Sequence, residues 1–261
     1  MSIPNIIIAG CSLSVDKTSL DIYQQTNSQQ KLYLCYPYFT EQFYRGKYKI
    51  HNIARDASDN GTISRNINML VEDLWDKDMH DMMVIVQWSG LDRHSMFVEE
   101  DYCSGTAGHS FYRKKYNGWS LSSLDGTHER WSDYYLHEHS EEKATQSTLD
   151  NISKTQQFLK SKGIKYKMFC GWQIFSNDLN INEHIDTSDF IFFENDTGSY
   201  NDVAEWNDTG YSKYGGMKEW IRHNVDNKYW TRGEGDQHPH NIAQEKFTYG
   251  VILNLVDEMD L

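Results

Sequence analysis

Proline, cysteine and long apolar runs are all scarce in this chain of 261 residues. Three prolines and an apolar content of 38% argue against a disordered, low-complexity protein and for a packed core. The four cysteines form no CxxC pair, so we expect reduced thiols rather than disulfides. The apolar run near the N-terminus is far too short for a signal peptide or a membrane span, so we expect neither, and no membrane partner.

Positive charge is scarce as well. The 25 Lys and Arg residues are outnumbered by 38 Asp and Glu residues, and the formal net charge is −13. No block of basic residues offsets this balance, and contacts with a phosphate backbone need clustered Lys and Arg. We therefore expect no nucleic-acid partner. The pairs His137/His139 and His238/His240 have no identifiable third ligand, so we also expect no metal and no cofactor.

Apolar stretches of strand length alternate with stretches that repeat apolar residues every three or four positions. Strands are predicted at 6–9, 47–54, 82–88, 164–170 and 189–195, and helices over 62–74, 145–163 and 241–259. The run MMVIVQW at 82–88 is typical of a strand at the centre of a parallel sheet, where both faces are buried. The alternation predicts one α/β domain over residues 1–261, with a mostly parallel sheet covered by helices on both sides.

Residues 94–140 interrupt this alternation. They are rich in Tyr, Trp, His, Gly and Ser and have no clear periodicity. Long irregular segments within compact domains are usually functional loops or disordered, and so many aromatic rings favour order. We predict an insertion that leaves the α/β core and packs near the functional site, or binds a protein partner or a second copy of the chain.

The stretch NIIIAGCSLS, residues 5–14, ends an apolar strand in a small polar turn. Ligands of parallel α/β sheets bind at the carboxyl ends of the strands, near the point where the strand order reverses. The first strand of such a sheet usually lies centrally, so its exit turn places Ser12 at this edge. A serine there is a candidate nucleophile, although such a turn alone is weak evidence.

The stretch GEGDQHPHN, residues 233–241, directly precedes the last predicted helix and adds a candidate base and its partner. A serine nucleophile needs a base to take its proton, and the base needs an acceptor that fixes its tautomer. His238 and Asp236 supply these two groups from one turn. We therefore predict a catalytic triad of Ser12, His238 and Asp236, with Glu234 as the alternative to Asp236.

These blocks, in this order, resemble those of the SGNH, or GDSL-type, serine hydrolase family. IIIAGCSLS is similar to the first block, G-D-S-L-S, with Cys11 in place of the usual Asp, and GDQHPHN is similar to the last block. ASDNGTISRNI, residues 57–67, is similar to the second block, whose backbone N–H helps to bind the oxyanion. The resemblance covers essentially the whole chain outside the insertion. It implies a flavodoxin-like three-layer α/β/α sandwich, no metal, and ester hydrolysis through an acyl-enzyme.

The chain departs from the family at the third block, G-x-N-D, whose Asn donates to the oxyanion. The matching stretch is QWSGLDR, residues 87–93, with Leu91 at the position of that Asn. A strand that ends in Gln-Trp-Ser and is followed by Arg resembles divergent, virus-encoded members. The residues that we expect to bind the oxyanion or the substrate come from the second and third blocks: Ser58, Asn60, Gly61, Gln87, Ser89 and Arg93.

The resemblance and the residues together predict a serine esterase or acyl-hydrolase. Its substrate would be a small acyl ester or, given the aromatic insertion, an O-acylated carbohydrate. The missing Asn favours an alternative, a catalytically weak or inactive SGNH-like scaffold that serves as a structural or binding protein of a viral particle. We expect the protein in the cytoplasm or carried in such a particle.

Overall fold

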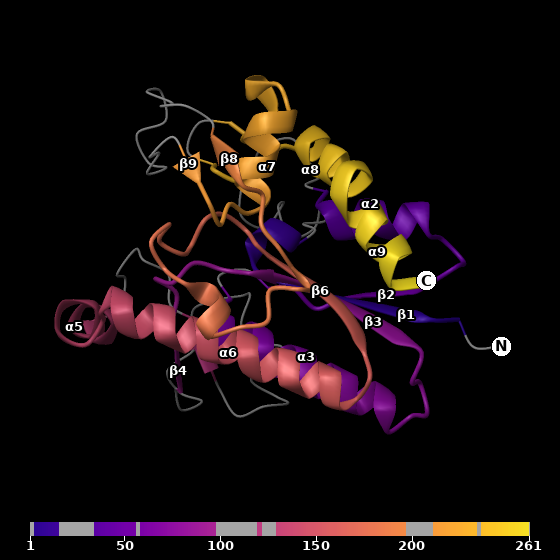
Figure 1. The fold of residues 1–261 in the computed structure, drawn as a ribbon, viewed down its shortest axis with the longest axis horizontal. Coiled ribbons are helices and arrows are strands. Elements are labelled where there is room, and N and C mark those ends of the chain that lie inside the picture. The colour runs from indigo at the N-terminus through magenta and orange to yellow at the C-terminus, as the bar shows by residue number, and fades with distance from the viewer. Residues whose placement is uncertain are drawn as a thin grey trace.

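The computed structural model describes residues 3–15, 34–55, 58–97, 119–121, 129–196, 211–233 and 236–260. Its centre is a five-stranded sheet in which every neighbouring pair is parallel (Figure 1). The strands, in the order β2-β1-β3-β6-β7 across the sheet, are Lys49–Asn52, Asn5–Ala9, Met82–Trp88, Lys165–Cys170 and Phe190–Ile191. The predicted α/β class with a parallel sheet is therefore confirmed.

The strand order reverses at β1. The chain runs from β1 outward to β2 and then crosses back to β3 on the other side of β1. Ile8 pairs with Asn52 of β2 and with Ile85 of β3, so the three strands end close to the same level. The loops that follow β1 and β3 consequently flank the reversal point, where ligands bind in sheets of this type.

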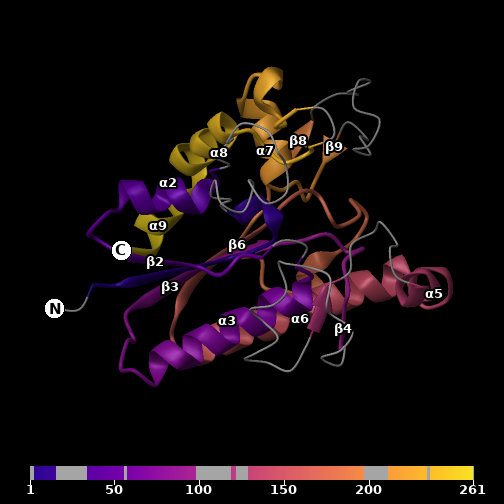
Figure 2. The same ribbon diagram turned by 180° about the vertical axis from the view of Figure 1, so that it is seen from behind.

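Helices cover both faces of the sheet (Figures 1 and 2). Alternate residues of a strand point to opposite faces, so Ile7 and Val84 pack under one helical layer and Ile6 and Ile85 under the other. The first layer contains α3 (Asn60–Trp75) and α6 (Glu141–Ser161). The second contains α2 (Tyr36–Phe43), α7 (Met217–Asn224), α8 (Asn241–Phe247) and α9 (Leu253–Asp260).

The helix starts follow from capping side chains. Asp59 accepts a hydrogen bond from the Thr62 N–H at 2.5 Å and begins α3 two residues before the predicted start. Ser140 accepts from the Lys143 N–H at 3.2 Å, so α6 begins at Glu141, ahead of the apolar repeat that predicted it. Both helices therefore begin directly after their capping residues, ahead of the first residue of the apolar repeat.

The last predicted helix is interrupted. A π-helical turn, Thr248–Ile252, separates α8 from α9. Within it, Gly250 packs against the indole of Trp220, and a Cβ at this position would lie 2.7 Å from that ring. The glycine therefore permits close packing between this turn and α7.

The predicted strand at 189–195 is wrong in its extent. Only Phe190–Ile191 join the main sheet, because the chain then turns and the Phe193 N–H donates to the Gly215 carbonyl at 2.9 Å. Asn195–Asp196 (β8) instead pair antiparallel with Tyr211–Ser212 (β9). The short helices α2 and α7 and the 3-10 turns Ile181–Glu183 and Asn227–Tyr229 were not predicted.

The described parts of the predicted insertion lie outside the main sheet. Its two described strands, Ser95–Phe97 (β4) and Trp119–Leu121 (β5), pair antiparallel with each other. Helix α5, Glu129–His137, is anchored to the loop after β3, because the Tyr135 hydroxyl donates to the Asp92 carbonyl at 2.5 Å. The rest of the insertion is outside the described residues.

No helix in the described ranges has the length and apolar character needed to cross a membrane.

Candidate functional site

The predicted nucleophile lies in the turn that follows β1. Ser12 is the first residue of a 3-10 helix, Ser12–Ser14, and is 9% exposed. The first N–H groups of a helix have no partner within it. The Ser12 N–H donates to no described residue, so it can serve an incoming oxyanion.

A buried polar network supports this turn from below. The Gln87 side chain donates to Cys11 Sγ at 3.3 Å, and its oxygen accepts from the Ser14 hydroxyl. The Ser14 hydroxyl also contacts the Tyr36 hydroxyl at 2.9 Å. A Cβ at Gly10 would lie 2.6 Å from Ser14 Oγ, so the glycine allows the turn to fold onto this network. Gln87 is thus enclosed and engaged at both of its polar atoms.

The thiol beside the nucleophile has an unusual electrostatic environment. Burial alone would raise the pKa of Cys11, but the Arg93 charge and hydrogen bonds from the Leu13 N–H and Gln87 bring the pKa below its ordinary value. Cys11 is nevertheless completely buried. The thiol is therefore not presented to a substrate.

The predicted base and its partner are in contact. His238 Nδ1 lies 2.6 Å from Asp236 Oδ1, and the His238 backbone N–H also donates to this oxygen at 3.0 Å. Burial would raise the pKa of Asp236, but the hydrogen bonds and charge of His238 lower it. A bridge between Gly233 and Asp236 closes the turn, and the φ of 140° at Gly233 requires a glycine. The alternative partner, Glu234, is outside the described residues.

Arg232 links this loop to the Ser12 turn. Its backbone N–H donates to the His238 carbonyl at 2.9 Å, and its Nε donates to the Pro239 carbonyl at 3.2 Å. Its Nη2 reaches Cys35 Sγ at 3.4 Å, and the Cys35 thiol donates to the Val15 carbonyl at 3.1 Å. A chain of contacts thus connects the loop of Asp236 and His238 with the segment after Ser12.

Helix α8 makes a second link. Gln244 is completely buried and donates to the Leu13 carbonyl at 3.0 Å, while its oxygen accepts from the Tyr36 N–H at 3.1 Å. Within the described part of the chain, no hydrogen bond joins the Ser12 hydroxyl to the His238 imidazole. Their direct contact therefore stays a prediction, although the segments that carry them are joined.

The second predicted block is largely structural. The Asn60 carboxamide donates to the Ser89 carbonyl and to Thr148 Oγ1, each at 3.0 Å, and accepts from the Ser89 N–H at 2.7 Å. It therefore fastens α3 to the loop after β3 and to α6, and has no donor left for an oxyanion. Ser58 and Ser89 are completely buried.

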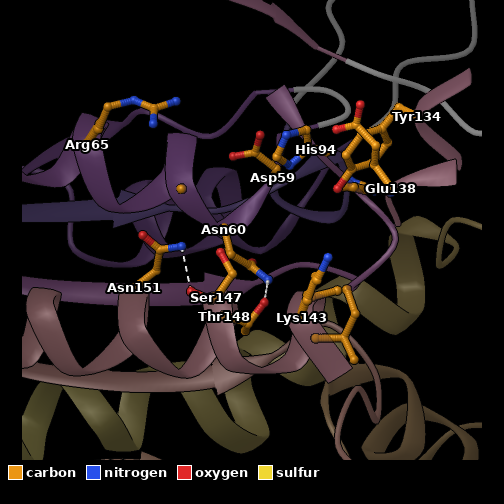
Figure 3. A pocket seen from close by; sticks show the side chains of 14 residues that line it. Asp59, Asn60, Arg65, His94, Tyr134, Glu138, Lys143, Ser147, Thr148 and Asn151 are labelled. Atoms are coloured by element: carbon orange, nitrogen blue, oxygen red, sulfur yellow. Dashed lines mark hydrogen bonds between the residues drawn. The ribbon is translucent and has the colours of Figure 1, made fainter. Parts of the chain in front are cut away.

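A pocket of about 400 Å³ lies beside this clamp, between α3, α5 and α6 (Figure 3). Three of the predicted binding residues line it, Asn60, Gly61 and Arg93, whereas Ser58, Gln87 and Ser89 do not. Leu91, which occupies the position of the family's Asn, also lines the pocket and packs against the core of the sheet.

Lys218, at this edge of the sheet, was not among the predicted site residues, and it lies beside Trp172. The Trp172 ring, directly after β6, lies 5.5 Å from the Arg93 guanidinium and 5.1 Å from the Lys218 ammonium. Burial, assisted by the charges of Arg222 and Arg93, lowers the pKa of Lys218 to about 8, although Glu219 and Cys11 oppose this fall. Neither residue belongs to a motif, so only the fold brings them to the Ser12 turn.

No model of a known protein family matches this chain, and no curated protein matches it either.

Proposed function

We propose that the protein is a serine esterase or acyl-hydrolase of the SGNH type. The observation that carries this proposal is the 2.6 Å contact between Asp236 and His238, on a loop tied through Arg232 and α8 to the turn of Ser12. A half-buried aspartate that holds His Nδ1 leaves Nε2 to act as a base. The reversal of strand order beside β1 supports the assignment, because substrates of such sheets bind there.

In the proposed reaction, His238 Nε2 takes the Ser12 proton as Oγ attacks the acyl carbonyl. The His238 imidazolium then gives this proton to the leaving alcohol, which yields an acyl-enzyme and the free alcohol. Water, activated by the same imidazole, releases the acid and restores Ser12. Asp236 keeps the imidazole in the required tautomer and stabilises its charged form.

The oxyanion would be held by the N–H groups of Ser12 and Gly61 and by the Arg93 guanidinium. Arg93 is the best candidate for the donor that Leu91 does not supply, because Asn60 and Gln87 are engaged elsewhere. Losing one such donor typically slows an enzyme by about 100- to 1000-fold. The positively charged guanidinium of Arg93 would take the place of the missing Asn donor and keep the site active.

The test is hydrolysis of a short-chain aryl ester, together with labelling by a fluorophosphonate that reacts with active serines. The wild type should hydrolyse the ester and gain one label on Ser12, and Ser12→Ala should lose both. Cys11→Ala is the matched control and should retain labelling. Activity that survives Ser12→Ala but disappears in Cys11→Ala would assign the nucleophile to the thiol and refute the proposal.

The second candidate function is an SGNH-like scaffold without significant activity, acting as a structural or binding component of a viral particle. Leu91 at the position of the family's Asn favours it, as does the lack of a hydrogen bond between Ser12 and His238. A folded wild-type protein that neither hydrolyses aryl esters nor accepts the label would support this alternative.

A further inference from the structure

The pocket between α3, α5 and α6 contains polar groups that have no partner among the residues that the structure describes. Arg93 Nη1 is buried and has no hydrogen-bond partner in the described part of the chain. Lys143 and Glu138, which also line the pocket, are exposed, and their charged groups form no hydrogen bond or salt bridge with any described residue, so both can turn to a ligand. A buried donor without a partner is unfavourable, so Arg93 in particular favours a ligand that brings an acceptor.

The lining also restricts the chemistry of that ligand. Three basic residues, Arg65, Arg93 and Lys143, line the pocket together with two acidic ones, Asp59 and Glu138. A simple anion would meet the two carboxylates, and a simple cation would meet the three basic groups. Hydroxyl groups both donate and accept hydrogen bonds, so a polyhydroxylated ligand can satisfy both kinds of side chain.

The side chains in Figure 3 come from opposite walls of the pocket. Asp59 and His94 lie near Tyr134 and Glu138 on one side, and Lys143 approaches from α6 below them (Figure 3). The Tyr134 ring is held by stacking on His94, with ring centroids 4.6 Å apart. Asn60 and Asn151 are fixed by hydrogen bonds to Thr148 and to the Ser147 carbonyl. Several pocket walls are thus fixed before a ligand arrives.

Arg93 connects the pocket with the nucleophile turn. Its guanidinium lines the pocket and lies over the Trp172 ring. The residue before Trp172, Gly171, lies against the Ser12 turn, since a Cβ at Gly171 would be 2.9 Å from Leu13 Cδ1. We propose that this pocket binds the sugar portion of an O-acylated carbohydrate and directs its ester toward Ser12. This inference rests on the proposed esterase function. It also assigns the described end of the insertion, Tyr134 and Glu138, to substrate selection.

The first test compares hydrolysis of a mono-O-acetylated hexose with hydrolysis of an aryl acetate, which has no sugar. Glu138→Gln and Lys143→Met should each lower the ratio of kcat/KM for the sugar ester to that for the aryl ester by about tenfold, the effect of one lost charged hydrogen bond. Glu142→Gln, on the exposed first turn of α6 and outside the pocket, is the control and should leave the ratio unchanged. An unchanged ratio in both pocket variants would overturn the inference.

The second test measures binding and does not depend on catalysis. Ser12→Ala protein should bind the acetylated hexose, detected by saturation-transfer NMR, and Glu138→Gln should weaken this binding about tenfold. If the wild type hydrolyses neither ester but the sugar binds in this way, the proposed function fails and the sugar pocket stands. No detectable binding of the hexose, or stronger binding of acetate at the same pocket, would overturn the sugar assignment.

Discussion

Lys218 holds a positive charge in a poorly solvated place beside the Ser12 turn. Burial, the largest influence, lowers its pKa from 10.5 to about 8. This fall corresponds to roughly 3 kcal/mol of destabilisation when the folded protein carries the charged form. The contact with the Trp172 ring at 5.1 Å returns about 1 kcal/mol. We therefore predict that Lys218→Met raises the free energy of unfolding by about 2 kcal/mol at pH 7.

The pH dependence of this stabilisation shows whether the buried charge of Lys218 causes it. Because the folded pKa lies below the unfolded one, the penalty is fully present below pH 8 and is relieved as the pH rises toward 10.5. The stabilisation by Lys218→Met should thus shrink by about 2 kcal/mol between pH 7 and pH 10 in urea unfolding. Lys162→Met is the control, since Lys162 also lies over an indole, 4.8 Å from the Trp75 ring. Equal stabilisation by Lys218→Met at both pH values would refute the reasoning.

A charge that destabilises the fold beside a candidate nucleophile suggests a use in the reaction. We expect aryl-ester hydrolysis by the wild type to decline as Lys218 loses its proton near pH 8. Lys218→Met should be slower at pH 7 and should lack this decline. A decline near pH 8 that persists in the variant would assign it to another group and separate Lys218 from catalysis.

Other substitutions test the supports of the site. Arg232→Met should lower kcat for an aryl ester about tenfold with little change in KM, because the loop of His238 loses its tie to the Ser12 turn; a change confined to KM would contradict this. Asn60→Ala should lower the free energy of unfolding by about 3 kcal/mol in urea, because it leaves buried groups around Ser89 unpaired; a loss under 0.5 kcal/mol would show that the clamp is dispensable. Gly250→Ala should cost about 2 kcal/mol in the same assay, since its methyl group meets the Trp220 ring, and an unchanged stability would show that the ring can move aside.

Apolar patterning predicted the elements that carry most of the core. The strand at 82–88 matches β3 residue for residue, because a strand buried on both faces is apolar throughout. The predicted helix at 62–74 matches α3 apart from its caps. At 189–195 the apolar pattern predicted too long a strand. The apolar residues that follow β7 pack against the core without pairing in the main sheet. The π-helical turn near residue 250 could not be predicted, because the apolar repeat of a π-helical turn does not differ from that of a continuous α-helix.

The candidate site was predicted in part. The Asp236–His238 contact follows from two residues close in sequence, which a turn brings together. The engagement of Asn60 and Gln87 could not be foreseen, because their partners come from other elements and only packing selects them. Arg232 and Lys218 carried no motif, and their importance arises from neighbours distant in the chain.

The link between Gln244 and the Leu13 carbonyl spans 231 residues of sequence. We expect a contact of this range to form late in folding, because long-range contacts require the closure of a long loop. During synthesis, the turn of Ser12 emerges long before α8 and the loop of His238 exist to support it. The proposed esterase activity should consequently be among the last properties to return during refolding, after the helical signal has recovered, and its appearance would report that the Ser12 turn and α8 have met.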